Sequence, residues 1–157
     1  MTAIAAVAHR GRVWIAGDSA LVCDDRVIYT ASPKVWRVGE MVVGAAGDVA
    51  YLAAIGRVQW PSRAQDSWPR IREALEAAGV PPDEGECLIG HRGKLWEATT
   101  ALYPVAGTFA AIGTGAAYCV GALAVSRLDP PARVREAVRV ARDHCTTVGG
   151  RIVVVST

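Results

Sequence analysis

The chain has 157 residues, of which 52% are hydrophobic and 20% are charged, and its formal net charge is +2. A chain of this length makes one ordinary domain, and its hydrophobic content excludes intrinsic disorder. The small net charge argues against a nucleic-acid-binding protein, and no apolar run approaches the roughly 20 residues that a membrane span needs. We therefore expect a single domain over residues 1–157 that binds neither nucleic acid nor membrane.

The cysteines stand far apart in the sequence, at Cys23, Cys87, Cys119 and Cys145. No two of them form a C-x-x-C pair, so neither a structural zinc site nor a thioredoxin-like redox site is expected. The apolar start of the chain lacks the charged region that opens an export signal. We therefore expect a cytoplasmic protein with buried free thiols, and we expect no metal and no cofactor.

The first half of the chain predicts strands followed by two helices. The apolar runs 3–8 and 13–16 flank a turn that contains Gly11, a pattern typical of a β-hairpin. Further strands are expected at 27–30, 35–38 and 41–45, and helices at 48–58 and 68–78. We expect Ser67 to cap the second helix and Gly79 to end it.

The second half of the chain predicts the same order of elements. A second hairpin is expected over 86–98, followed by a strand at 109–112. The remaining elements are helices at 116–128 and 132–146 and a last strand at 151–155. Strands and helices come in groups and do not alternate singly. This order favours an α+β fold of antiparallel sheets with separate helix layers over a doubly wound parallel sheet.

Ser19 is the first candidate for chemistry, because Gly17-Asp18-Ser19 follows a predicted strand. The block resembles the nucleophile block of GDSL-type esterases, in which the serine attacks an ester. Such an enzyme needs a histidine base that is held by an acid. Those enzymes usually carry Asp-x-x-His near the C-terminus, but here Asp143 and His144 are adjacent. A structural hydroxyl at the end of a strand is the simpler interpretation of Ser19.

The segment Gly113-Thr114-Gly115 is the second candidate, because it lies between a predicted strand and a predicted helix. Such a loop can present backbone N–H groups to an anion. A dinucleotide site would need a further glycine where Tyr118 stands, and an acid at the end of a second strand. A tight turn from strand to helix is therefore the favoured interpretation.

Thr2 is the third candidate, because removal of an initiator methionine is favoured before a small residue. The freed hydroxyl could attack a carbonyl while the α-amine takes its proton. The α-amine titrates at about 7.7–8.0, and a nearby cation disfavours its protonated form. The mechanism therefore needs a lysine near Thr2 and an acid that holds this lysine.

The register of the first hairpin supplies that acid. If residues 10–11 form a two-residue turn, Thr2 lies opposite Ser19 and beside Asp18. Lys34 is the only lysine in the first half of the chain, and it stands among apolar strands. A buried lysine there needs a partner, and Asp18 is the obvious one. The alternative is an exposed loop lysine and a turn aspartate.

With these residues in place, the sequence resembles the proteasome β-subunit and HslV-like family of N-terminal-nucleophile hydrolases. The blocks that carry the likeness follow the family's order and lie at 2–7, 13–18, 34–37, 44–48, 111–118 and 141–145. The likeness covers most of the chain. It implies a four-layer α-β-β-α sandwich of two antiparallel sheets.

The resemblance also implies roles for the residues of the proposed centre. Thr2 would be the nucleophile and, through its amine, the base. Lys34 would tune the local field, and Asp18 would hold Lys34. The backbone N–H of Gly47 would donate to the oxyanion, and Thr114 would lie beside the amine.

The remaining implied residues surround this centre. Asp143 would be a supporting acid near the site. The residues expected to line the substrate pocket are Leu21, Ser32, Ala46 and Ala50. These side chains are small or apolar, so cleavage after apolar residues is expected.

The resemblance implies a threonine endopeptidase that acts on peptides or unfolded proteins as a homo-oligomeric ring. The chain contains no ATP-binding motif, so an ATP-dependent unfoldase would have to be a separate partner. The region 58–86 is short for the family, and a retained Met1 would block the amine. A non-catalytic structural subunit is therefore the alternative function.

Overall fold

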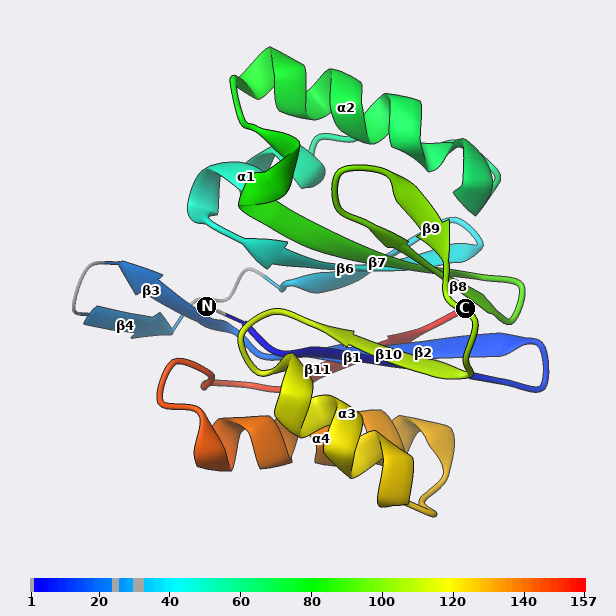
Figure 1. Ribbon diagram of the computed structural model, residues 1–157, viewed down its shortest axis with the longest axis vertical. Helices are drawn as coiled ribbons and strands as arrows, with labels where there is room; N and C mark the ends of the chain where they lie inside the picture. Colours follow the sequence, from blue (N-terminus) through cyan, green and yellow to red (C-terminus); the bar gives the residue numbers. More distant parts are fainter. Residues whose placement is uncertain (1, 24–25, 30–32) are drawn as a thin grey trace.

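Two antiparallel sheets stacked between two pairs of helices give the chain four layers (Figure 1). The computed structural model describes residues 2–23, 26–29 and 33–157, with the side chains of 2–21 and 33–157. The layer order of helices, sheet, sheet and helices confirms the predicted α-β-β-α sandwich. The grouping of strands and helices along the chain is also the predicted one.

The chain opens with a hairpin of β1 (Ile4–His9) and β2 (Arg12–Gly17). Its turn residues Arg10 and Gly11 have φ values of 47° and 78°, the left-handed geometry that two-residue hairpin turns favour. The pairing has the register predicted from the sequence. The end of β2 therefore lies beside the start of β1.

The first sheet has the strand order β10-β1-β2-β11. The outer strands β10 (Phe109–Ile112) and β11 (Val153–Ser156) pair antiparallel with β1 and β2. The helices α3 (Ala116–Val125) and α4 (Pro130–His144) cover the outer face of this sheet (Figure 1). α3 is shorter than predicted, because the backbone turns to an extended conformation at Ser126.

The second sheet is built by the middle of the chain and has the order β5-β6-β7-β8-β9. Its strands are β5 (Val35–Val38), β6 (Met41–Gly47), β7 (Gly85–His91), β8 (Lys94–Ala98) and β9 (Leu102–Pro104). The helices α1 (Val49–Ile55) and α2 (Ser67–Ala78) cover its outer face (Figure 1). Two short 3-10 turns, η1 (Ala64–Asp66) and η2 (Pro82–Glu84), flank α2.

A separate two-stranded ribbon, β3 (Ala20–Cys23) with β4 (Arg26–Tyr29), projects from the end of the sheets (Figure 1). The sequence predicts a strand near β4 but misses β3 and β9. β9 is an edge strand of three residues that ends in Pro104, and proline is depleted in strands. Neither strand has enough length for a clear alternation of apolar and polar residues.

β1 shows no alternation because both of its faces are buried. Ala3, Ala5 and Val7 pack in the core under α3 and α4. Ile4 and Ala6 pack in the core between the two sheets. A strand buried on both faces reads as a continuous apolar run, and here it fixes the chain that leads back to Thr2.

The predicted ends of α1 need correction. The helix stops at Ile55, and Gly56 takes the C-cap position with its N–H bonded to the Leu52 carbonyl. Ala50, in the first turn of the helix, is exposed. The buried residues of the helix are Tyr51, Ala54 and Ile55.

The predicted cap of α2 is also wrong. Asp66 occupies the N-cap, whereas Ser67 is the first helical residue. The Ser67 hydroxyl is buried and has no hydrogen-bond partner among the described atoms. Gly79 ends the helix in the left-handed conformation, with φ of 67°, as predicted.

The thiols are free wherever the structure describes them. Cys87 and Cys119 are buried, as predicted, and Cys145 is partly buried. Burial raises the pKa of the Cys119 thiol to about 12. The side chain of Cys23 lies outside the described residues. In the same described part of the chain, no helix combines the length and apolar character of a membrane span.

Candidate active site

Thr2 lies just before β1 and is 1% exposed, which is unusual for a polar residue near the start of a chain. Its N–H donates to Thr114 Oγ1 at 3.2 Å, and its carbonyl accepts from the Gly115 N–H at 3.1 Å. The loop after β10 therefore holds the backbone of Thr2. The side-chain hydroxyl of Thr2 makes none of these contacts and faces the second sheet.

Lys34 binds the Thr2 hydroxyl from the second sheet, where it precedes β5. Its Nζ donates to Thr2 Oγ1 at 2.8 Å and to Asp18 Oδ1 at 3.1 Å. The side chains of Lys34 and Asp18 are 2% and 0% exposed. The predicted pairing of these two residues is confirmed, and the alternative of an exposed loop lysine is wrong.

Asp18 follows β2 and is fixed by four hydrogen bonds. Its Oδ1 accepts from Lys34 and from the Ala3 N–H at 3.1 Å. Its Oδ2 accepts from the N–H groups of Ala20 and Gly149, both at 3.2 Å. A buried carboxylate with this number of donors has one orientation, so it fixes the Lys34 ammonium in turn.

Burial lowers the pKa of Lys34 from its ordinary value, and the nearby Asp18 carboxylate opposes part of this effect. The Asp18 carboxylate favours the ammonium form of Lys34, and in this buried environment the field of an ammonium group acts strongly on its neighbours. A cation there disfavours a second positive charge on the nitrogen of Thr2. This is the electrostatic condition that an amine base requires.

Two glycines shape the site around Thr2. Gly113 has φ of 86°, and a Cβ there would collide with the Thr2 carbonyl oxygen. Gly47 ends β6, and a Cβ there would lie 2.7 Å from the Tyr51 ring and 2.9 Å from the Glu84 carbonyl. Both positions therefore exclude side chains, and both line the cleft beside Thr2.

The cleft beside Thr2 has a volume of about 510 Å³. The sequence predicts Ala46, Gly47 and Thr114 in the site, and all three line this cleft with Thr2. The other side chains that line it are carboxylates, namely Asp48, Asp83, Glu84 and Glu86. These acids are not among the site residues predicted from the sequence, because three of them lie in η2 and β7, far along the chain from Thr2.

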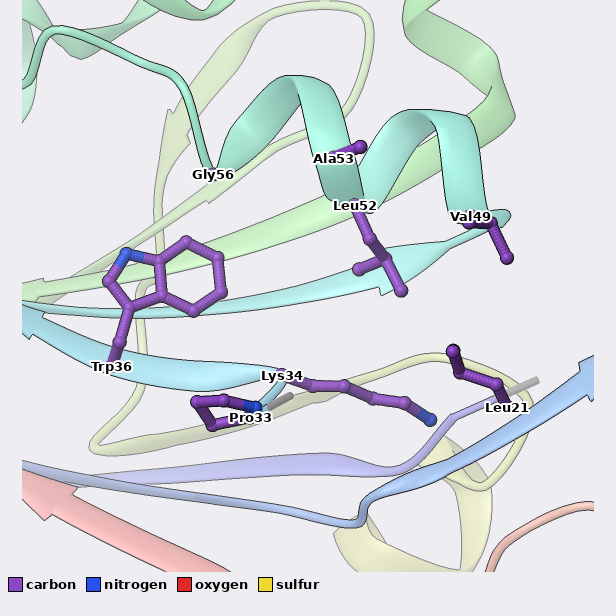
Figure 2. Close-up of a pocket in the computed structure, with 8 residues that line it drawn as sticks. All are labelled: Leu21, Pro33, Lys34, Trp36, Val49, Leu52, Ala53 and Gly56. Atoms are coloured by element: carbon purple, nitrogen blue, oxygen red, sulfur yellow. The ribbon is translucent and has the colours of Figure 1, made fainter. Parts of the chain in front are cut away.

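A second pocket, of about 380 Å³, lies on the other side of Lys34 between β5 and α1 (Figure 2). Leu21 lines it as predicted. The other lining residues are Pro33, Lys34, Trp36, Val49, Leu52, Ala53 and Gly56. Figure 2 shows Leu52 extending from α1 towards the Lys34 side chain. The pocket is therefore largely apolar.

One prediction for this pocket does not hold, and another concerns a residue that the structure does not describe. Ala50 lines neither the pocket nor the cleft, because the face of α1 that borders the pocket carries Val49, Leu52 and Ala53 at helical spacing. Ala50 is one residue away from this face and is exposed. Ser32 lies outside the described residues.

Asp143 lies near the end of α4 on the exposed face of the helix. Its carboxylate pairs with Arg139 at 2.6 Å and with Arg142 at 3.8 Å. Within the described chain, no hydrogen bond or ion pair joins it to Thr2 or Lys34. Its role as a supporting acid stays a prediction that no contact supports.

Ser19 is buried, and its hydroxyl accepts a hydrogen bond from the Arg151 N–H at 2.9 Å. None of the hydrogen bonds that the structure places at Ser19 comes from a histidine. Its hydroxyl holds the segment that leads into β11, which is a structural role. The described residues also contain no group of three or more His, Cys, Asp or Glu side chains that could hold a metal ion.

The two stacked sheets and the two helix layers define a fold class. The chain has the HslV-like, proteasome-type fold of the N-terminal-nucleophile hydrolases, as the sequence resemblance predicts. No protein-family model matches the chain.

Comparison with solved structures gives the particular likenesses. BPH from Thiobacillus denitrificans, in complex with epoxomicin, has a TM-score of 0.83 and 20% identity over 99% of this chain and 98% of its own. The eukaryotic HslV from Trypanosoma brucei has a TM-score of 0.79 and 18% identity over 99% and 98%. A Gly-1 mutant of Anbu from Hyphomicrobium sp. strain MC1 has a TM-score of 0.76 and 16% identity over 99% and 80%. Identities this low show the fold, and the activity has to be argued from the site.

Proposed function

We propose that the chain is a threonine endopeptidase whose nucleophile is Thr2, exposed by removal of Met1. The observation that carries this proposal is the hydrogen bond of 2.8 Å from Lys34 Nζ to Thr2 Oγ1, with Asp18 behind the lysine. A buried lysine and a buried carboxylate are costly to place, so a lysine that is held by Asp18 and donates to the Thr2 hydroxyl supports a chemical role.

The proposed reaction starts at the Thr2 hydroxyl. The neutral α-amine takes the hydroxyl proton, directly or through one water, as Oγ1 attacks the peptide carbonyl carbon. Lys34 stabilises the negative charge that develops on Oγ1, and the Gly47 N–H donates to the carbonyl oxygen as it becomes an oxyanion.

Collapse of the tetrahedral intermediate breaks the C–N bond. The amine of Thr2 returns its proton to the leaving nitrogen, which departs with the C-terminal part of the substrate. A water molecule then hydrolyses the ester on Oγ1 and restores the free hydroxyl. Thr114 Oγ1, 3.2 Å from the Thr2 nitrogen, orients the amine for both transfers.

Thr2→Ala tests this proposal, because it removes the nucleophile and leaves the backbone contacts of residue 2 in place. Hydrolysis of a fluorogenic peptide should fall to the background rate. Thr2→Ser keeps a hydroxyl and should retain activity. Epoxomicin, which BPH of T. denitrificans binds, should inhibit the wild-type chain. Full activity of Thr2→Ala would refute the assignment.

The substrate pocket in this proposal is the apolar one beside Lys34. Among the described residues that line this pocket, which include Leu21, Trp36 and Leu52, Lys34 is the only charged one, and its ammonium donates to Asp18 and Thr2. Substrates with leucine before the scissile bond should therefore be cleaved faster than those with arginine or aspartate there. A panel of peptides that differ only at this residue measures the preference, and best cleavage after arginine or aspartate would overturn it.

The working form in this proposal is a cytoplasmic homo-oligomeric ring that degrades peptides and unfolded proteins. An ATP-dependent unfoldase would be its partner for folded substrates. Light scattering should give a solution mass that is a multiple of the 16.5 kDa chain. A monomeric mass would contradict the ring. A chain that retains Met1 and hydrolyses nothing would instead be a structural subunit.

A further inference from the structure

Glu86 joins the two sheets at the wall of the cleft beside Thr2. It lies near the start of β7 in the second sheet, and its Oε2 accepts a hydrogen bond of 2.8 Å from the Gly113 N–H. Gly113 directly follows β10 in the first sheet. The bond therefore links the second sheet to the loop that contacts Thr2.

The loop of residues 113–115 contacts Thr2 through each of its residues. The Cα of Gly113 packs against the Thr2 carbonyl so closely that no side chain fits. Thr114 Oγ1 accepts from the Thr2 nitrogen, and the Gly115 N–H donates to the Thr2 carbonyl. A shift of this loop would move the hydroxyl that orients the reacting amine.

The loop has little stiffness of its own. Two of its three residues are glycines, whose backbones adopt many conformations, and Gly113 takes a positive φ of 86°. Gly115 is fixed by packing against Ala3 and Ala141, where a Cβ would lie 2.7 Å and 3.1 Å from their methyl groups. The N–H of Gly113 is held by the Glu86 carboxylate.

The position of Glu86 is electrostatically unfavourable without such a contact. Asp48, Asp83 and Glu84 line the same cleft. The charge of Glu86 also adds to the effect of burial in raising the pKa of Glu97. A carboxylate among carboxylates is repelled, and a charge-assisted hydrogen bond to a backbone N–H offsets that repulsion.

We propose that Glu86 is a positioning residue of the peptidase, which fixes the loop 113–115 through the Gly113 N–H and thereby orients the Thr2 amine. This inference rests on the proposed function. Glu86 acts through Gly113 and Thr114 and not on the substrate. Its removal should therefore lower kcat and leave KM nearly unchanged.

Three variants separate the hydrogen bond from the charge. Glu86→Ala removes both, and kcat should fall by about tenfold, the usual effect of one charge-assisted hydrogen bond. Glu86→Gln keeps an acceptor oxygen at the same reach and should stay within about threefold of the wild type. Glu86→Asp keeps the charge but is one methylene shorter, so it should resemble Glu86→Ala. Glu97→Ala removes a carboxylate from the neighbouring strand and should leave kcat unchanged.

Hydrogen exchange measures the loop without relying on catalysis. Peptides that cover residues 109–116 should exchange faster in Glu86→Ala and Glu86→Asp than in the wild type, Glu86→Gln or Glu97→Ala. Wild-type kcat or wild-type loop exchange in Glu86→Ala would overturn the role of Glu86, as would a Glu86→Gln variant as impaired as Glu86→Ala. A wild-type chain that hydrolyses no peptide would contradict the proposed function itself, which is a distinguishable result.

Discussion

A buried lysine beside a buried carboxylate is subject to two opposing effects on its ionisation. Removal from water disfavours the ammonium form of Lys34, and the Asp18 carboxylate favours it. Burial is the larger effect, so the pKa of Lys34 lies below its ordinary value of 10.5. Lys34 therefore loses its charge at a lower pH than an exposed lysine does.

This shift predicts the alkaline side of the pH–rate profile. As pH rises through the lowered pKa of Lys34, the cation that stabilises the attacking oxygen is lost and kcat/KM should fall. The fall should begin below pH 10.5, the ordinary pKa of a lysine. Rates of peptide hydrolysis between pH 6 and 10 would show it, with circular dichroism as the control for unfolding. A rate that stays flat up to the ordinary pKa of lysine would contradict the proposed role of Lys34.

Asp18 and Lys34 can be predicted from the sequence, because nearby residues are enough to place them. Asp18 follows from the register of one hairpin, and Lys34 is the only lysine in the first half of the chain. Glu86 cannot be predicted in this way, since its partner Gly113 belongs to the other sheet. Asp143 is placed by the family resemblance alone, and the arginines of its own helix hold it on the surface.

At the scale of elements, two turns contain a glycine with positive φ, and these two glycines have different functions. Gly11 lies in the β1–β2 turn with nothing within 4 Å of a Cβ, whereas a Cβ at Gly113 would collide with Thr2. Gly11→Ala should cost about 1 kcal/mol of unfolding free energy and leave activity intact. Gly113→Ala carries the same backbone cost but should also lower kcat by at least about tenfold.

Urea unfolding and peptide hydrolysis measured on both variants would test this pair. The comparison is matched because each substitution adds one methyl group at a left-handed position. Equal activity of the two variants would mean that the loop after β10 does not position Thr2.

Hairpins and long helices are predictable here, and short edge elements are not. Both hairpins follow from a glycine-bearing turn between apolar runs, because the turn fixes the register. β9 has three residues and pairs only with β8, so contacts made in the folded chain, and not its own sequence, place it in the sheet. The sequence places the end of α1 at Val58, but the helix ends at Ile55, and the apolar Val58 packs in the core without being helical.

At the scale of the whole molecule, the two sheets are joined at both ends in different ways. At one end, the β1–β2 turn of the first sheet meets the β7–β8 turn of the second sheet. A Cβ built on Gly93 would lie 2.6 Å from the Gly11 Cα. At the other end, Lys34 with Asp18 and Glu86 with Gly113 are polar links across the same interface. The element order could predict the layers, but only the packed sheets show that the polar links gather at the Thr2 end.

The central claim is that Thr2, freed of Met1, is the attacking group. The most direct test is to quench the protein during peptide turnover and to locate the acylated residue by mass spectrometry of its fragments. The account predicts an acyl group on a Thr2 that begins the chain. An active protein that retains Met1, or an acyl group on Ser19, would contradict it.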